Sequence, residues 1–393
     1  MARPERDALT VRAGVWRRIL AAVFLLAAAP AFADDVQVLQ GTHDDAPYRI
    51  DMPAHWNGGL VMFVHGYGGE GTARGGVEYP RIGDVALKGN YAWAGSGYRS
   101  QGYHPDLFLA DTIALREMFI ARFGTPRWTI LYGESMGGHM VVAGLERHPD
   151  LFQAGLAECG VVDGVGLIDW YYAYTAAAQY FSGVPLLDAT AADYDRRVAE
   201  FVARIGKPGA YTERGRRFDS AVRALAGGDM PAWGDGMAKH YLEDLWPRVP
   251  LPRQSAEFAR HADTRGIVYG IAPGLGVDAA TLNRDIPRIV PAAGARTGIF
   301  APFTGRLRGP LMTLHDTADL DVPVRMAQNY RRRTQAAGTS ALLVQRTQTR
   351  SDHCDFSQPL RDETFTDLVA WLERGIVPKG EDLLGDVTKL GFR

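Results

Sequence analysis

The stretch WTILYGESMGGHMVVAGLER, residues 128–147, decides the fold. Its first five residues are apolar or aromatic apart from one threonine, which indicates a buried strand, and the residues after the glycine pair favour a helix. Between them, Ser135 has a glycine two positions away on each side. Only small residues there let a strand turn sharply into a helix, with the serine in a strained backbone conformation and its hydroxyl clear of the sheet. We therefore predict that Ser135 is a nucleophile. The alternative is a glycine-rich turn without chemistry.

Strands alternate with helices on both sides of this stretch. Such alternation predicts an α/β fold with a mostly parallel sheet covered by helices on both faces. Strands are predicted at 60–64, 91–95, 128–132, 154–157, 311–314 and 341–345, helices at 107–123, 136–147, 324–336 and 362–374, and a hairpin at 36–52.

The alternation stops at residue 161 and resumes at residue 308. The intervening residues 161–307 have helical and loop-like patterns, and they are too many for a structureless loop in a compact domain. We interpret them as a helical cap inserted after the strand that ends near Cys159. The core is then made of residues 34–160 and 308–393.

Aromatic residues crowd the first part of this insertion, among them Trp170, Tyr171 and Tyr174. One interpretation is an aromatic wall that binds an apolar group of the substrate. The other is that the rings pack the cap onto the core. The sequence leaves both open.

Residues 63–69, FVHGYGG, follow an earlier apolar strand. The backbone N–H of Tyr67 in this glycine-rich loop and that of Met136, at the start of the helix after Ser135, are the predicted donors to a developing oxyanion. A phosphate-binding loop is the alternative, but no Gly-Lys-Ser or Gly-Lys-Thr follows.

A nucleophilic serine needs a base, and the base needs a carboxylate that orients it. Of ten histidines, only His353 falls after the last predicted strand. Asp319 lies a few residues beyond a late strand, where a loop can reach the imidazole, and it is our choice of acid. Asp316 and Asp321 are its local rivals. Asp352 is adjacent to the histidine and would point elsewhere in an extended segment.

These segments resemble the α/β-hydrolase superfamily. The segment from His315 to Pro323 is similar to the His-Gly-x-x-Asp-x-x-Val-Pro segment of esterases and peptidases in this superfamily, and Asp352-His353 is similar to their Gly-His segment. Asp316 and Asp352 replace the usual glycines. The resemblance covers residues 55–160 and 308–375, stops at the cap, and implies the order serine, acid, histidine along the chain. It rests on His65-Gly66-Tyr67-Gly68, residues 133–138, His315 with Asp319, Val322 and Pro323, and Asp352-His353.

The chain contains two cysteines, Cys159 and Cys354. The segment His353-Cys354 resembles the His-Cys segment of tannases and feruloyl esterases. In those enzymes the cysteine after the catalytic histidine forms a disulfide with a cysteine before the catalytic serine. Here Glu134 occupies that position, so we hypothesise a disulfide between Cys159 and Cys354 instead. Two separate core thiols are the alternative.

Residues 1–33 are typical of a signal peptide: a basic region, an apolar run at 19–29, and Ala31-Phe32-Ala33 before Asp34. The apolar run is too short to span a bilayer comfortably, so we expect export to the periplasm or beyond without a stable membrane anchor. A formal net charge of −2 gives no reason to expect a nucleic-acid partner. We expect no cofactor and no metal, because no His, Cys and carboxylate cluster has ligand spacing.

Together these features favour a secreted serine hydrolase that cleaves a small carboxylic ester through an acyl-enzyme. A prolyl-oligopeptidase-like peptidase acting on short peptides and an acyltransferase use the same core. A non-catalytic binding protein on the same fold is the remaining alternative, and the intact serine, acid and histidine argue against it.

Overall fold

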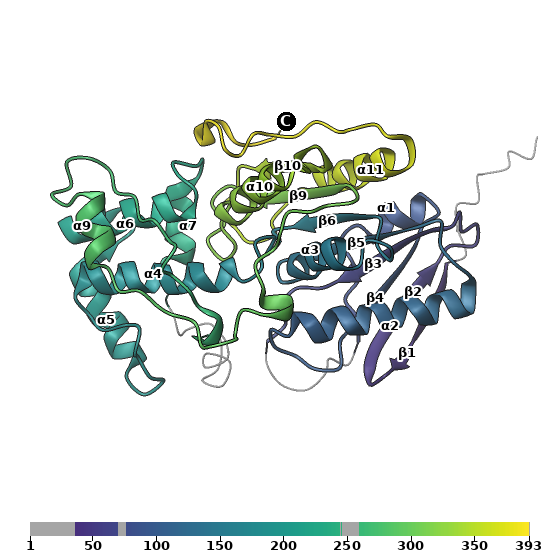
Figure 1. The fold of residues 1–393 in the computed structure, drawn as a ribbon, viewed down its shortest axis with the longest axis horizontal. Helices are drawn as coiled ribbons and strands as arrows, with labels where there is room; N and C mark the ends of the chain where they lie inside the picture. The colour runs from purple at the N-terminus through teal and green to yellow at the C-terminus, as the bar shows by residue number, and fades with distance from the viewer. Residues whose placement is uncertain (1–35, 70–75, 244, 246–258, 393) are drawn as a thin grey trace, which may run out of the picture. The chain divides into compact units, whose positions relative to one another are not determined.

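The computed structural model describes residues 36–69, 76–243, 245 and 259–392 (Figure 1). Val36–Arg393 form one compact unit, which contains both the predicted core and the predicted insertion. The predicted signal peptide, residues 1–33, lies outside the described residues.

The described residues form an eight-stranded sheet in the order β1-β2-β4-β3-β5-β6-β9-β10. The β1–β2 and β2–β4 pairs are antiparallel, and all other neighbours in the sheet are parallel, as the alternation of elements predicted. The strands are β1 (Gln37–His43), β2 (Ala46–Met52), β3 (Gly59–Val64), β4 (Ala92–Ser96), β5 (Trp128–Glu134), β6 (Ala154–Glu158), β9 (Leu311–Asp316) and β10 (Leu343–Gln348).

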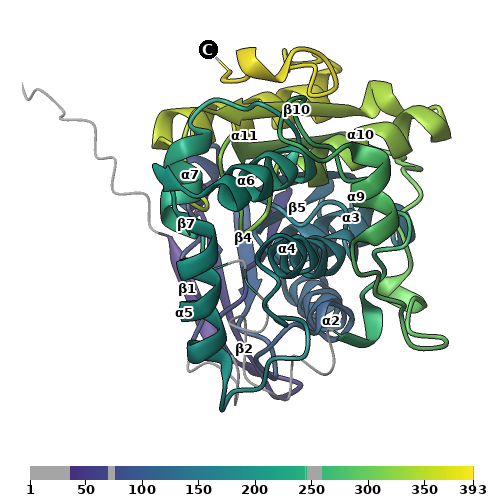
Figure 2. The ribbon, with the colours of Figure 1, turned by 90° about the vertical axis from the view of Figure 1, so that its left-hand side faces the viewer.

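Helices cover both faces of this sheet. Helices α2 (Pro105–Phe123), α3 (Gly137–Arg147) and α10 (Arg325–Ala337) lie on one side (Figure 2), where their apolar side chains join one large buried cluster. Helices α1 (Gly83–Lys88) and α11 (Gln358–Arg374) contribute to a second cluster on the other face. This burial of both faces is why the inner strands are continuously apolar rather than alternating.

Several elements differ from the sequence prediction, and two of the differences have a clear local cause. Helix α1 was not predicted, because six residues are too few to show a helical period. The last strand begins at Leu343 rather than at 341, because Ser340–Leu342 form a 3-10 turn after Gly338 has ended α10 in the left-handed region at φ 73°.

The described part of the insertion consists of helices and loops, and it also contains a small two-stranded ribbon. A cluster of aromatic side chains forms its interior: the ring centroids of Tyr174 and Phe218 lie 5.4 Å apart, and those of Phe201 and Tyr241 lie 5.6 Å apart. The described part of the insertion includes α4 (Gly166–Ser182), α5 (Tyr194–Ile205), β7 (Gly206–Lys207), β8 (Ala210–Tyr211), α6 (Glu213–Ala226), α7 (Trp233–His240), α9 (Ala279–Asp285) and the 3-10 turn η1 (Gly298–Phe300).

Helix α4 joins this insertion to the core. Seven residues separate it from the end of β6, it is buried along most of its length, and it is followed by Gly183 in the left-handed conformation that commonly terminates helices. Among the described residues, no helix has both the length and the apolar content that crossing a membrane requires.

Candidate active site

Ser135 occupies the turn between β5 and α3 in the left-handed region, at φ 53°. This conformation is strained for a residue with a side chain, so neighbouring contacts must hold it. The backbone N–H of Ser135 donates to the carbonyl oxygen of Glu158 over 3.0 Å. The carbonyl oxygen of Ser135 accepts from Gly138 at 2.9 Å and from Val161 at 3.0 Å.

The glycines around Ser135 are required by close backbone packing. A Cβ on Gly137 would lie 2.0 Å from the carbonyl oxygen of Val64, at the end of β3. One on Gly133 would lie 2.6 Å from the carbonyl of Gly137, and one on Gly138 would lie 2.4 Å from the Cα of Gly160. Each distance is well below a van der Waals contact, so the spacing read from the sequence has a steric cause.

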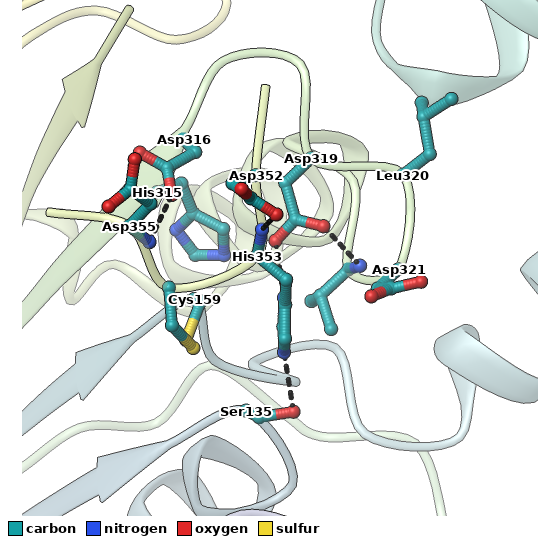
Figure 3. Close-up of polar contacts among 12 residues, drawn as sticks. Ser135, Cys159, His315, Asp316, Asp319, Leu320, Asp321, Asp352, His353 and Asp355 are labelled. Atoms are coloured by element: carbon teal, nitrogen blue, oxygen red, sulfur yellow. Dashed lines mark hydrogen bonds and ion pairs between the residues drawn. A yellow bond between two sulfur atoms is a disulfide. The ribbon is translucent and has the colours of Figure 1, made fainter. Parts of the chain in front are cut away.

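The structure brings Ser135, His353 and Asp319 together (Figure 3). The Ser135 Oγ lies 2.8 Å from Nε2 of His353, and Nδ1 of His353 lies 2.7 Å from Oδ2 of Asp319. With Nδ1 protonated and bound to the carboxylate, Nε2 is left to accept the serine proton. The backbone N–H of Val322 donates to Oδ1 of Asp319 at 3.1 Å and fixes the carboxylate.

The rival acids make other contacts. The N–H of Asp355 donates to Oδ2 of Asp316 at 3.0 Å, and Asp352 forms an ion pair with Lys239 at 2.6 Å. Asp321 lies 3.6 Å from Nδ1 of His240. Asp352 accepts from the backbone N–H of His353, at 3.3 Å, whereas Asp319 is the carboxylate that is hydrogen-bonded to the imidazole.

The charges around His353 favour its protonated form. Burial alone lowers the pKa of the imidazole, but the negative charge of Asp319, with smaller effects of Asp321 and Asp316, outweighs burial and raises the pKa to about 9. Burial raises the pKa of the Asp319 carboxyl, and the adjacent imidazolium opposes that shift. In the free protein at neutral pH, the pair is stabilised as an imidazolium and a carboxylate.

The loop after β3 passes directly beside the serine. A Cβ on Gly66 would lie 3.2 Å from Cβ of Ser135, so the loop that carries Tyr67 borders the space above the hydroxyl. Met136 is the residue before the first turn of α3. Both predicted oxyanion donors thus belong to segments that flank Ser135, and their role stays a prediction.

His139, four residues after Ser135, is fully buried and faces the insertion. Its Nδ1 lies 2.8 Å from the hydroxyl of Tyr103, and its Nε2 lies 3.0 Å from the carbonyl of Ile299. Burial lowers the pKa of this imidazole to about 4, so it stays neutral. These contacts give it a structural role.

The three aromatic residues of α4 make the contacts expected of the packing interpretation, and their role in substrate binding stays a prediction. Trp170, Tyr171 and Tyr174 are all buried. Trp170 Nε1 donates to the carbonyl of Leu320 at 2.9 Å, and the Tyr171 hydroxyl donates to that of Asp321 at 3.0 Å. The Tyr174 hydroxyl donates to a carbonyl within the insertion at 2.8 Å. The helical spacing and the composition of a sequence cannot distinguish aromatic rings that pack inside the protein from rings that bind a substrate.

Two of these rings therefore support the loop that carries Asp319. Trp170 also lines a cavity of about 620 Å³ beside α10. Among the described residues, the lining of this cavity includes none of the Ser135, Asp319 and His353 side chains. The cavity is lined mainly by residues of α4, α10 and the segment 263–268.

Cys159 and Cys354 form a disulfide, with their Cα atoms 5.2 Å apart. Cys159 directly follows β6, and Cys354 directly follows His353, so the bond joins the histidine loop to the strand next to the nucleophile's strand. Both residues have positive φ, 44° and 59°.

Helix α7 of the insertion contacts both catalytic loops, and no pattern in the sequence predicts these contacts. Lys239 forms its ion pair with Asp352, and Nε2 of His240 donates to the carbonyl of Ser351 at 3.0 Å. Burial lowers the pKa of His240, but hydrogen bonding and charge from Asp321 reverse this effect and raise it.

Within the described chain, three groups of side chains bring possible metal ligands within 4.8 Å of one another. One contains both sulfurs of the disulfide, and a second consists of the Asp319–His353 pair with Asp321. The third is His240 with Glu243 and Asp321. Nδ1 of His240 lies 3.6 Å from a carboxylate oxygen of each acid, as in an ion pair with a protonated imidazole.

The fold and this site define a serine hydrolase of the esterase or peptidase type. Feruloyl esterase B from Aspergillus oryzae superimposes with a TM-score of 0.52 at 14% identity, over 87% of this chain and 80% of that one. With the strand order, this confirms the α/β-hydrolase fold. A model of the prolyl oligopeptidase family matches residues 90–198, a stretch that includes Ser135.

Two further solved structures are similar at lower scores. One is an esterase from Pyrococcus furiosus, with a TM-score of 0.44 and 14% identity over 87% of this chain and 91% of that chain. The other is an acylaminoacyl peptidase from Pyrococcus horikoshii, with a TM-score of 0.43 and 12% identity over 89% of this chain and 44% of that chain. No curated protein sequence matches the chain.

The elevated pKa of His353 predicts an alkaline activity profile. Only the neutral imidazole accepts the serine proton, so kcat/KM should rise with pH and level off above about 9. Asp321→Asn removes one of the charges that raise this pKa, so the rise should move to lower pH, with several-fold higher kcat/KM at pH 7.

The measurement is kcat/KM from pH 5 to 10 on a chromogenic ester. Asp150→Asn is the control, because this exposed acid pairs with Arg308 and does not act on His353. An unchanged profile in Asp321→Asn would contradict this account of the histidine's surroundings.

Removing the disulfide should lower both stability and activity. The bond closes a loop with a sequence separation of 195 residues, which corresponds to about 5 kcal/mol in the chain-entropy model. The Cys159→Ser/Cys354→Ser variant is therefore expected to unfold at lower urea concentration. Its kcat should also fall, because Cys354 adjoins His353. A folded variant with the wild-type kcat would show that the bond does not help to place the histidine.

Proposed function

We propose that the protein hydrolyses a carboxylic ester through a covalent acyl-enzyme on Ser135. His353 Nε2 takes the proton from Oγ as the oxygen attacks the ester carbonyl, and Asp319 stabilises the resulting imidazolium. The backbone N–H groups of Tyr67 and Met136 stabilise the tetrahedral oxyanion. His353 then protonates the departing alcohol, and water releases the acid by the same steps.

The observation that carries this proposal is the unbroken hydrogen-bonded chain from Ser135 through His353 to Asp319. Its acid end is fully buried, and its serine end lies on a strained turn. A serine with an adjacent base, itself oriented by a carboxylate, is the general arrangement for nucleophilic acyl transfer. A protein that only binds a ligand has no need of it.

An ester is favoured as substrate by the solved structure that superimposes best on this chain among those reported above, which is named a feruloyl esterase. Peptide cleavage is the second candidate, and the match of residues 90–198 to the prolyl oligopeptidase family supports it. Acyl transfer needs only an alcohol in place of water. The expected substrate is a small ester or a short peptide.

Ser135→Ala tests the mechanism directly. The wild-type protein should hydrolyse short p-nitrophenyl esters faster than proline p-nitroanilides, and the variant should lose at least about 10⁴-fold in kcat. Ser100→Ala serves as the control, because it removes a hydroxyl from a different loop of the same sheet edge. Wild-type rates in Ser135→Ala would exclude the mechanism, and a preference for the anilides would favour the peptidase.

We further propose that the protein acts after export, with residues 1–33 removed. The proposal rests on the basic region, apolar run and small-residue cleavage site of that segment. A disulfide between the two cysteines suits an oxidising compartment. N-terminal sequencing of protein recovered from the periplasm or the medium should begin at Asp34. Recovery of the uncleaved chain from the membrane would contradict it.

A further inference from the structure

We propose that a closed ring of hydrogen bonds and ion pairs beneath the active site positions Ser135 relative to His353, and that Arg361 is its central positioning residue. The inference deepens the proposed function and rests on it. The ring consists of Arg81, Tyr132, Glu134, Glu158, Arg361 and the carbonyl group of Cys354.

One side of the ring belongs to the nucleophile. Glu134 directly precedes Ser135, and its Oε1 accepts from the hydroxyl of Tyr132 at 2.5 Å. The same hydroxyl lies 3.2 Å from Oε2 of Glu158, the last residue of β6. The carbonyl of Glu158 in turn accepts from the N–H of Ser135. The ends of β5 and β6 are thereby held together immediately below the serine.

The other side belongs to the histidine loop. Arg361, on α11, is buried, and its Nε donates to Oε2 of Glu158 at 2.9 Å. Its Nη2 donates to the carbonyl of Cys354 at 2.6 Å, and its Nη1 donates to that of Phe356. One planar guanidinium thus holds two carbonyls of the loop that follows His353 together with the carboxylate under the serine.

Arg81 closes the ring from the outside. Its Nη1 donates to the carbonyl of Cys354 at 2.7 Å, and its Nε lies 3.4 Å from Oε2 of Glu134. The residue before the nucleophile and the residue after the base are therefore connected by two separate routes. The ring contains two guanidinium groups and two carboxyl groups, and burial raises the pKa of the Glu158 carboxyl to about 7 despite the adjacent Arg361.

Stability alone does not account for this arrangement. Burying an Arg–Glu pair has a desolvation cost that its Coulombic attraction barely offsets, and apolar replacements of similar volume are often as stable. The ring does hold a backbone that needs support, because Cys354 has a φ of 59°. It also spans the two segments whose separation sets the 2.8 Å contact between Ser135 and His353. A misplacement of about 1 Å in such a contact lowers rates by about 100-fold.

The test is the paired variant Glu158→Gln/Arg361→Gln in the full chain, which removes both charges and leaves no buried ion unpaired. We expect kcat on a p-nitrophenyl ester and the rate constant of fluorophosphonate labelling to fall by about 100-fold, with KM changed less than threefold. Arg81→Gln changes the half-exposed end of the ring and should lower both rates by a smaller factor. This variant still tests the proposal if the Glu158→Gln/Arg361→Gln protein does not fold.

Arg346→Gln/Asp367→Asn is the matched control. Arg346 is buried, as Arg361 is, and it pairs with Asp367 on α11, the helix that also carries Arg361. The other hydrogen bonds of Arg346 in the described chain go to Lys379 and Thr364, away from both catalytic loops. It should lower the unfolding midpoint without changing kcat. The proposal is overturned if the folded ring variants keep wild-type kcat and labelling rate, or if the control loses as much kcat. Failure of the wild-type protein to react with the fluorophosphonate would instead overturn the proposed function.

Discussion

The close packing of the Ser135 turn against the end of β3 is the constraint on which the rest of the site depends. With the Gly137 backbone pressed against the carbonyl of Val64, the chain leaves β5 and enters α3 with no room for a side chain. Ser135 is then forced into a positive φ, and its hydroxyl projects from the sheet edge. The acid and the histidine arrive at the same edge because β9 and β10 run parallel to β5, so their carboxyl ends meet there.

The carboxyl end of the sheet also has to hold buried carboxyl groups. Asp319 and Asp316 are both fully buried, and burial raises the pKa of each carboxyl, that of Asp316 to about 8. The positive charge of His353 offsets the cost for Asp319. The insertion also helps to hold the site in place, because Trp170 and Tyr171 of α4 hydrogen-bond the backbone of the acid loop. The insertion therefore supports the acid loop of the site.

The core of this arrangement could be predicted from the sequence because each of its parts has a local signal. Ser135 lies between glycines, while Asp319 and His353 each follow an apolar strand in the order the fold requires. The role of the α4 aromatics could not be predicted, since rings that pack and rings that bind have the same composition and spacing. The contact of Arg361 with Glu158 joins residues 203 positions apart, and only the folded chain shows that it exists. The same holds for helix α7 and its contacts with both catalytic loops.

The central claim is that Ser135 is the nucleophile, and a peptide map of the inactivated protein tests it most directly. The mature protein would be treated with a fluorophosphonate until its esterase activity is lost, then digested with trypsin. The account predicts one phosphonyl group per chain, in proportion to lost activity, on the tryptic peptide of residues 128–147 and at Ser135 within it. An adduct on another residue, or full activity loss with that peptide unmodified, would contradict it.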